Sequence, residues 1–390
     1  MVAACQFPVN YGSPAAIREL SETLSEMGHH IHVVTYPDGQ DLSVGRAQIH
    51  RVGRARDASG LRVGPSWQKP WLDLLVLIRL CKIVRREKVD IIHAHNYEGG
   101  LIGVLAKFLT GRPLIYNSVN LMSDELHTYK VMPRFLSNVV ARVLDWFVPI
   151  FPDHIIAVTR ELYDWHLRQG TPPDRLTLVP CGIKPEMFAK ADPAKLRAQF
   201  AIGTRPVVMY TGINNAFQRV DHLLRAFRVV LDHEPAAVLM IVSPITNEPN
   251  RPANEALAHS LGIASSVIWV GPHELKELPD YLALADVCVV PRCECPGHPI
   301  KLLNYMIAEK PIVCFAGAAK GITHMSEAWI VPDHDWAQFG QGILKLLRDR
   351  PLALRLAATG RETAIREFDW RVLCRKVEGI YERILPDRDA

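Results

Sequence analysis

Residues 206–243 read PVVMYTGINNAFQRVDHLLRAFRVVLDHEPAAVLMIVS, and this stretch decides the fold. Its two ends, residues 206–212 and 237–243, are short apolar runs of the kind found in buried strands. Residues 218–231, between them, have the apolar spacing of an amphipathic helix. Buried strands that alternate with amphipathic helices are typical of a parallel sheet covered on both faces. The stretch therefore predicts one strand–helix–strand unit of a parallel α/β sheet.

The same alternation extends along the chain in both directions. Further strand-like runs follow at residues 266–271, 285–291, 310–316 and 328–332, and earlier ones lie at residues 1–5, 30–36, 89–95, 112–117 and 154–159. Between the first two runs we expect a helix over residues 13–28, with Ser13 as its N-cap, Pro14 at its first position and Gly28 at its end. Two such series predict an α/β fold with two doubly wound, Rossmann-like domains that face a central cleft.

The length of 390 residues also favours two domains, because one hydrophobic core rarely serves so long a chain. The second series restarts after residues 192–206, and residues 368–385 have the pattern of a terminal helix. We therefore predict domains at residues 1–183 and 184–367, with residues 368–390 returning to the first domain.

The composition is that of a globular protein, with 48% hydrophobic and 22% charged residues. The net charge of +4 is compatible with an anionic ligand or membrane surface, but it is too small to indicate nucleic-acid binding. The eight cysteines are scattered, which is typical of reduced, buried thiols in the cytoplasm. Cys293 and Cys295, with His298 nearby, match no zinc-site spacing, so we expect no metal ion.

No secretory signal opens the chain, and charged residues interrupt its most apolar segments, so we expect a cytoplasmic protein without a spanning helix. Residues 129–151 combine basic side chains with Trp and Phe. They are compatible either with peripheral contact at the inner face of an anionic membrane or with a helix buried between the domains.

In open α/β sheets, ligands bind beyond the carboxyl ends of the strands. Gly12 follows the first strand and opens a helix, where backbone N–H groups either face an anion or form an ordinary turn. His93 and His95 share one strand face, and Glu98 follows in the next loop. Either the two histidines are a hydrogen-bonded pair in the core, or the side chains form a polar cluster that faces a sugar.

The loop between residues 290 and 301 places two cations near the mouth of the second sheet. Arg292 follows a buried strand, and Lys301 lies at the start of the next helix. Two cations beside a helix N-terminus suit a phosphate, and Gly297 and Pro299 allow the backbone to turn closely. The alternative is a solvated charge pair.

Several stretches in order resemble a known family. They are GSPAAIRELSETLSEMGHHIHVVT (12–35), DIIHAHNYEG (90–99), DHIIAVTRELYDWHLRQG (153–170) with LTLVPCGIKPEMF (176–188), VVMYTGINNAFQRVDHLLRAF (207–227) and HPIKLLNYMIAEKPIV (298–313). Together they resemble the retaining, nucleotide-sugar-dependent glycosyltransferases of family 4, which have the two-domain GT-B architecture. The resemblance implies an acceptor site in the N-terminal domain, a nucleotide-sugar site in the C-terminal domain, and no metal or other cofactor.

Some family positions hold unusual residues here. Only Gly12 remains of the glycine-rich first loop, Val119 stands in the register of a sugar-contacting histidine, and Ile213 and Gln218 replace a phosphate-binding arginine and lysine. The paired glutamates of the family fall on Pro296 and Asn304. The nine-residue spacing of Arg292 and Lys301 resembles a branch of the family in which these cations bind the diphosphate.

The resemblance therefore implies two sets of site residues. For the donor diphosphate and nucleotide the set is Gly12, Gly212, Gln218, Arg292, Lys301 and Asn304; for the sugar and acceptor it is His95, Glu98, Asn120 and Gly182. The leading hypothesis is retaining sugar transfer to a glycan or lipid-linked acceptor. A degenerate nucleotide- or glycan-binding partner subunit is the second hypothesis, and a nucleotide-sugar epimerase of the same fold is the third.

Overall fold

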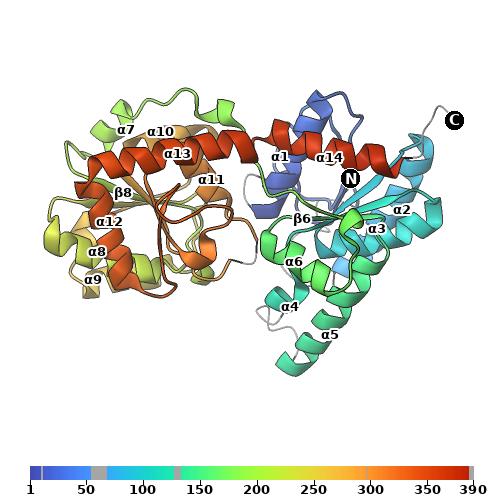
Figure 1. Ribbon diagram of the computed structural model, residues 1–390, viewed down its shortest axis with the longest axis horizontal. Helices are drawn as coiled ribbons and strands as arrows, with labels where there is room; N and C mark the ends of the chain where they lie inside the picture. The colour runs from blue at the N-terminus through green and yellow to red at the C-terminus, as the bar shows by residue number, and fades with distance from the viewer. Residues whose placement is uncertain (10–11, 54–67, 127–132, 296, 386–390) are drawn as a thin grey trace. The chain divides into compact units, whose positions relative to one another are not determined.

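The computed structural model describes residues 1–9, 12–53, 68–126, 133–295 and 297–385. The chain divides into two compact units, one of Met1–Gly182 with Trp370–Ala390 and one of Ile183–Asp369 (Figure 1). The two segments in which the chain passes from one unit to the other are paired through their backbones. The Ile183 N–H donates a hydrogen bond of 2.8 Å to the Phe368 carbonyl. The predicted boundaries fell after residues 183 and 367.

The first unit is built on a seven-stranded sheet in the order β3-β2-β1-β4-β5-β6-β7, in which every pairing is parallel. Its strands are β1 (Val2–Ala3), β2 (His32–Thr35), β3 (Gln48–Arg51), β4 (Ile92–His95), β5 (Leu114–Ser118), β6 (His154–Ala157) and β7 (Leu176–Leu178). The strand patterns predicted five of these. The two that they missed, β3 and β7, are the edge strands, which carry polar residues because they are only partly buried.

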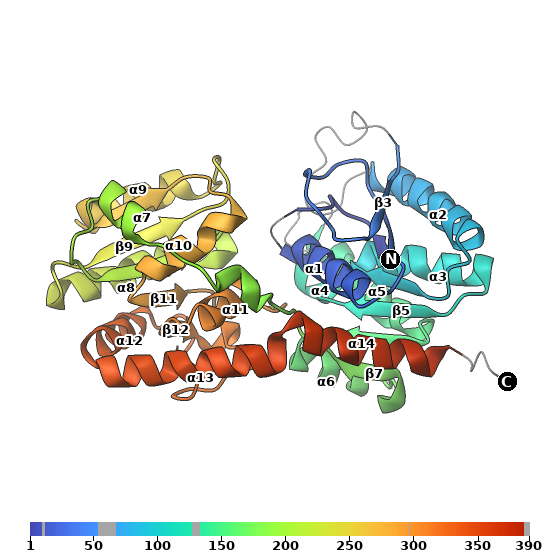
Figure 2. The ribbon, with the colours of Figure 1, turned by 90° about the horizontal axis from the view of Figure 1, so that it is seen from above.

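Helices cover both faces of this sheet (Figure 2). They are α1 (Gly12–Glu26), α2 (Lys69–Arg86), α3 (Asn96–Thr110), α4 (Met122–Glu125), α5 (Arg134–Phe147), α6 (Arg160–Arg168) and α14 (Trp370–Ile384). Helix α1 begins at Gly12, so Ser13 lies inside the helix and the prediction of Ser13 as its N-cap was wrong. Gly12 has a φ of 64°, a left-handed backbone that glycine adopts without strain.

The last helix, α14, completes the core of the first unit. Trp370, Leu373 and Val377 pack in one cluster with α1 residues Ile17 and Leu24. The Trp370 indole N–H also donates to the buried Glu19 carboxylate over 2.8 Å. The beginning and the end of the chain are therefore parts of one folded unit.

The second unit has a six-stranded parallel sheet in the order β10-β9-β8-β11-β12-β13. Its strands are β8 (Val207–Thr211), β9 (Val238–Val242), β10 (Val267–Val270), β11 (Val287–Val290), β12 (Ile312–Phe315) and β13 (Trp329–Val331), and all lie within the predicted runs. Its helices are α7 (Ala194–Gln199), α8 (Val220–His233), α9 (Arg251–Ser260), α10 (Leu278–Leu284), α11 (Ile300–Ile307), α12 (Trp336–Arg348) and α13 (Arg350–Phe368). Residues 206–243 form β8, α8 and β9, and the two strands are neighbours in this sheet.

Candidate functional site

In the second unit, Lys301 lies against the end of strand β8. It is the second residue of α11, and its Nζ atom lies 4.0 Å from the centre of the Tyr210 ring. The ammonium group donates to the Gln218 Oε1 atom over 2.8 Å. Gly212 has a φ of 132°, and a Cβ atom there would lie 2.8 Å from Nζ. Three predicted donor-site residues thus meet at one strand end.

Arg292 is the second cation at this edge of the sheet. Its guanidinium carbon lies 4.7 Å from the centre of the exposed Phe217 ring, and its Nε–H donates to the Glu294 carbonyl over 2.7 Å. Burial, and then the nearby charge of Arg292, holds the pKa of Lys301 well below its ordinary value. Among the residues that the structure describes, neither cation forms an ion pair with a carboxylate. Two neighbouring cations without a carboxylate are suited to bind an anion.

Helix α11 is fixed to β8 by a residue that the sequence reasoning missed. The Tyr305 hydroxyl accepts a hydrogen bond of 2.8 Å from the Thr211 backbone N–H, and Tyr305 is fully buried. This contact holds the start of α11 near the end of β8. Asn304 lies one turn after Lys301 and is partly exposed, whereas Pro296 lies outside the described residues.

In the first unit, His93 and His95 form a stacked pair with ring centres 4.4 Å apart. His95 is 0% exposed, and its Nδ1 lies 3.1 Å from the Asn117 amide nitrogen. The His93 Nδ1 lies 2.8 Å from the Tyr381 hydroxyl of α14. Burial lowers the pKa of His93 to about 3, so the imidazole is neutral. The structure places His95 in the core rather than on an open sugar-facing surface, because its strand is covered on both faces.

His93 borders a cavity of about 30 Å³, whose lining also includes Ser13, Asn117, Val119 and Trp370. The Nε2 atoms of both histidines and the Asn117 Oδ1 are buried, with no hydrogen-bond partner in the described part of the chain. A cavity of this size holds one water molecule. This volume is too small for a sugar.

Glu98, in the first turn of α3, does lie at the carboxyl ends of the strands. Its carboxylate pairs with the Lys69 ammonium over 2.8 Å. Asp73 of α2 lies nearby, where it accepts a 2.5 Å hydrogen bond from the Tyr36 hydroxyl, and burial raises the pKa of Asp73 to about 6. The sequence reasoning missed Lys69 and Asp73, because both belong to a helix whose docking against β2 and α3 is a tertiary contact.

The two remaining residues predicted for the sugar and acceptor side are Gly182 and Asn120. A Cβ atom on Gly182 would lie 2.5 Å from the Trp370 ring, so the close approach at this glycine is made by α14 rather than by a ligand. Asn120 follows β5 and is partly exposed. Its contact with an acceptor stays a prediction.

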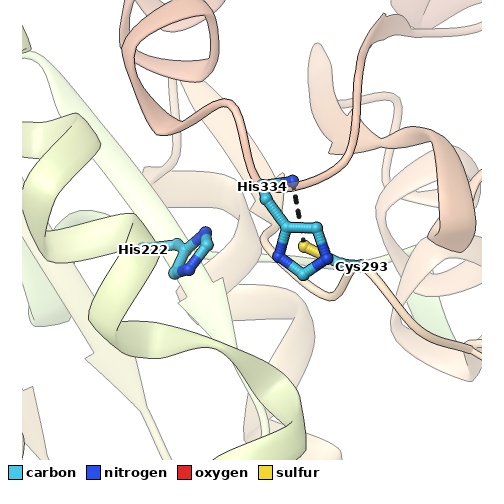
Figure 3. A group of neighbouring side chains, drawn as sticks. All are labelled: His222, Cys293 and His334. Atoms are coloured by element: carbon cyan, nitrogen blue, oxygen red, sulfur yellow. Dashed lines mark hydrogen bonds between the residues drawn. The ribbon is translucent and has the colours of Figure 1, made fainter.

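Among the described residues, one group has the composition and spacing to hold a metal ion. His222 in the first turn of α8, Cys293 after β11 and His334 after β13 bring their ligand atoms within 4.8 Å of one another (Figure 3). The sequence pattern groups Cys293 with Cys295 and His298 instead. In the structure, the Cys295 thiol donates to the Gly297 carbonyl over 3.2 Å, in a contact within its own loop.

Two family models match the chain, "Glycosyltransferase Family 4" over residues 12–187 and "Glycosyl transferases group 1" over residues 205–349. Both halves of the chain are thus similar to glycosyltransferases, the first half to those of family 4. Similar proteins include a D-inositol 3-phosphate glycosyltransferase of Thermobispora bispora, 25% identical over 96% of this chain and 90% of that protein. An MMP alpha-(1->4)-mannosyltransferase of Mycolicibacterium hassiacum is 24% identical over 96% of this chain and 95% of its own.

Solved structures confirm the GT-B fold of this chain. Anabaena HepE, solved with UDP and glucose, has a TM-score of 0.77 at 14% identity and covers 98% of this chain and 99% of its own. The sucrose-phosphate synthase from Thermosynechococcus elongatus has a TM-score of 0.78 at 20% identity and covers 96% and 94%. In the described part of the chain, no helix is both long enough and apolar enough to cross a membrane.

Proposed function

We propose that this chain transfers a sugar, with retention of anomeric configuration, from a nucleotide diphosphate sugar to a glycan or lipid-linked acceptor. The observation that carries the proposal is the Lys301 ammonium at the end of β8, beside Gln218 and Arg292. The reaction needs no metal ion or cofactor besides the donor, because the chain's own cations neutralise the leaving diphosphate.

The position of Lys301 explains how the family's usual cations are replaced. Gln218 stands where the resemblance expects a lysine, and the Lys301 ammonium lies within hydrogen-bond distance of that same side chain. A positive charge is thus supplied near the same place from α11 instead of from the β8–α8 loop. In the transfer, Lys301 and Arg292 stabilise the charge that develops on the diphosphate, and Asn304 binds the ribose.

A diphosphate also suits the electrostatics of this site. Burial and Arg292 disfavour the charged form of Lys301 in the free protein. A bound diphosphate would favour that form again, so we expect donor binding to be coupled to proton uptake and to weaken as the pH rises.

The acceptor is assigned to the first unit. Glu98 with Lys69, the neighbouring Asp73, and Asn120 are the polar side chains near its strand ends. Curated relatives act on phosphorylated inositol, as the D-inositol 3-phosphate glycosyltransferase does, or on a phosphatidylinositol mannoside. These names support a polyol-, glycan- or lipid-linked acceptor for this chain.

Peripheral membrane contact through α5 would bring the chain to a lipid-linked acceptor. Only Ser137, Ala141 and Asp145 of α5 are buried, and they lie on one side of the helix. The outward residues form an α5 apolar face, made of Phe135, Leu136, Val139, Val143, Trp146 and Phe147, which are between 41% and 81% exposed. Exposed Arg134 and Arg142 add positive charge for an anionic surface. The predicted contact began at residue 129, but residues 129–132 lie outside the described residues.

The proposed function is tested by transfer and donor hydrolysis with UDP-, GDP- and ADP-sugars, with and without a chelator. Transfer from one donor, with the donor's anomeric configuration in the product by NMR, supports it. Selective nucleotide binding without turnover of any donor would support the degenerate binding protein instead. That alternative is motivated by Val119, which places an apolar side chain in the register of the family's sugar-contacting histidine.

A further inference from the structure

Three segments of the second unit converge on His222, Cys293 and His334 (Figure 3). The segments are the first turn of α8, the loop after β11 and the loop after β13, and none of the three side chains has a role in the proposed transfer. Two imidazoles and one thiol, with ligand atoms within 4.8 Å, are the donor types that zinc prefers.

The backbone around Cys293 holds its sulfur in place. Cys293 is 3% exposed, and its Sγ accepts a hydrogen bond of 3.4 Å from the His334 backbone N–H. Its carbonyl approaches Gly317 so closely that a Cβ atom there would lie 1.4 Å from the oxygen. Such an N–H donor stabilises a metal-bound thiolate, as outer-shell hydrogen bonds do in metal sites.

The histidines are suited to act as neutral ligands. The Nδ1 atom of His222 is buried and has no hydrogen-bond partner among the residues that the structure describes. His334 has a φ of 65°, uncommon for a residue other than glycine, and its side chain is exposed.

Arg219 contacts one ring nitrogen of each histidine, the Nε2 atom of His222 and the Nδ1 atom of His334. Its guanidinium contacts a ring nitrogen of His222 and lies 3.4 Å from the Nδ1 of His334, and it also pairs with Asp221 over 3.0 Å. Neutral imidazoles that accept from a guanidinium have the electron pairs that a metal ion would take. Arg219 in this position and a bound metal ion exclude each other.

We propose that His222, Cys293 and His334 bind a zinc ion, with Arg219 as the competing cation. A tetrahedral zinc site needs ligand atoms about 3.5 Å apart, so the three side chains move closer together when the ion binds. The fourth position is open to water or to an anion. The ion takes no part in sugar transfer. It joins the loop that carries Arg292 to α8 and to the β13–α12 loop.

The test is a cobalt titration of the full-length, chelator-treated protein, because Co²⁺ bound by a thiolate has a near-ultraviolet charge-transfer band. We expect that band at one Co²⁺ per chain, and we expect equimolar Zn²⁺ to abolish it. Cys293→Ser should lose the band and Cys295→Ser, two residues away in the same loop, should keep it. A wild-type protein without the band, or a band that survives Cys293→Ser and disappears with Cys295→Ser, would overturn the proposal.

Two further variants separate metal binding from misfolding. His334→Ala removes an exposed side chain, so the fold should be kept by circular dichroism while Zn²⁺ affinity falls by more than about tenfold. Arg219→Asn removes the competing guanidinium and keeps a residue that tolerates the left-handed backbone, whose φ is 54°. It should tighten Zn²⁺ binding, and weaker binding would contradict the competition. All of these readouts are independent of transferase activity.

Discussion

Lys301 and Gln218 are 83 residues apart in the chain, and their side chains form a 2.8 Å hydrogen bond at the end of β8. An ammonium group from α11 therefore lies beside Gln218 of the β8–α8 loop, whose side chain is uncharged. The contact links two departures from the family pattern. Gln218 lacks the positive charge of the lysine that the resemblance expects, and Lys301 of α11 supplies a positive charge beside it.

Lys301→Met should remove most of the stabilisation of the leaving diphosphate. We expect kcat/KM for the donor to fall by about 10²–10³, the usual effect of removing a preorganised electrostatic group. Lys276→Met is the matched control, since the Lys276 side chain is 78% exposed. Steady-state kinetics measures both, and equal activities of the two variants would contradict the role of Lys301.

Gly212→Ala should disturb donor binding through Lys301. The new Cβ atom would lie 2.8 Å from Nζ and move the ammonium away from its position. Gly203→Ala is the control, because it also has a positive φ, of 59°, but its Cβ atom meets nothing within 4 Å. Both variants should lose roughly 1 kcal/mol of stability from backbone strain, and only Gly212→Ala should weaken nucleotide binding in calorimetry.

Asp145→Asn should loosen helix α5 from the first unit. The Asp145 carboxylate is buried, and it accepts hydrogen bonds from the Tyr97 hydroxyl at 2.7 Å and from the backbone N–H groups of Met122 at 2.8 Å and Ser123 at 3.0 Å. An amide in its place cannot accept at both ends, so we expect a loss of about 1–3 kcal/mol in the free energy of unfolding. Asp164→Asn, which removes an exposed pair with Arg160, should cost much less in the same urea titration.

The α5 apolar face should be required for vesicle binding. Phe135→Ser with Trp146→Ser removes two of its most exposed side chains, at 81% and 60%. We expect this pair of changes to abolish sedimentation with anionic liposomes at low salt. Leu354→Ser in the second unit, also an exposed position at 57%, should leave sedimentation unchanged. Failure of the wild-type protein to sediment at any salt concentration would contradict membrane contact.

Acid should unfold the first unit through its buried histidines. Burial lowers the pKa of His93 to about 3 and that of His166 to about 4, whereas an unfolded histidine titrates near 6.5. Between the folded and unfolded pKa values, the unfolded state binds more protons than the folded state. The contribution of these histidines to the free energy of unfolding is therefore fully present above about pH 6.5 and is lost as the pH falls toward 4. The expected slope is at most about 1.4 kcal/mol per pH unit for each histidine. His166→Gln should reduce the slope in urea titrations, and the exposed His259→Asn should not.

Most of the fold could be predicted because its central strands are continuously apolar. Strands β3 and β7 could not, since an edge strand such as Gln48–Arg51 needs no such pattern to pair with its neighbour. Lys301, Gln218 and Gly212 could be expected to meet because a parallel sheet brings its strand ends to one edge, and their contact with a donor stays a prediction. Other contacts depend on how distant segments pack: Cys293 meets His222 and His334 rather than the nearby Cys295, and Gly182 meets Trp370 rather than a ligand.

The position of α14 has a consequence for biosynthesis. Residues 1–182 leave the ribosome before the helix that completes their core, because Trp370 and its neighbours come after the whole second unit in the chain. Until then the α1 side chains Ile17 and Leu24 lack their apolar partners, and the Glu19 carboxylate lacks its indole donor. The second unit is synthesised whole in the meantime, so the half of the protein that is made first is the half that matures last.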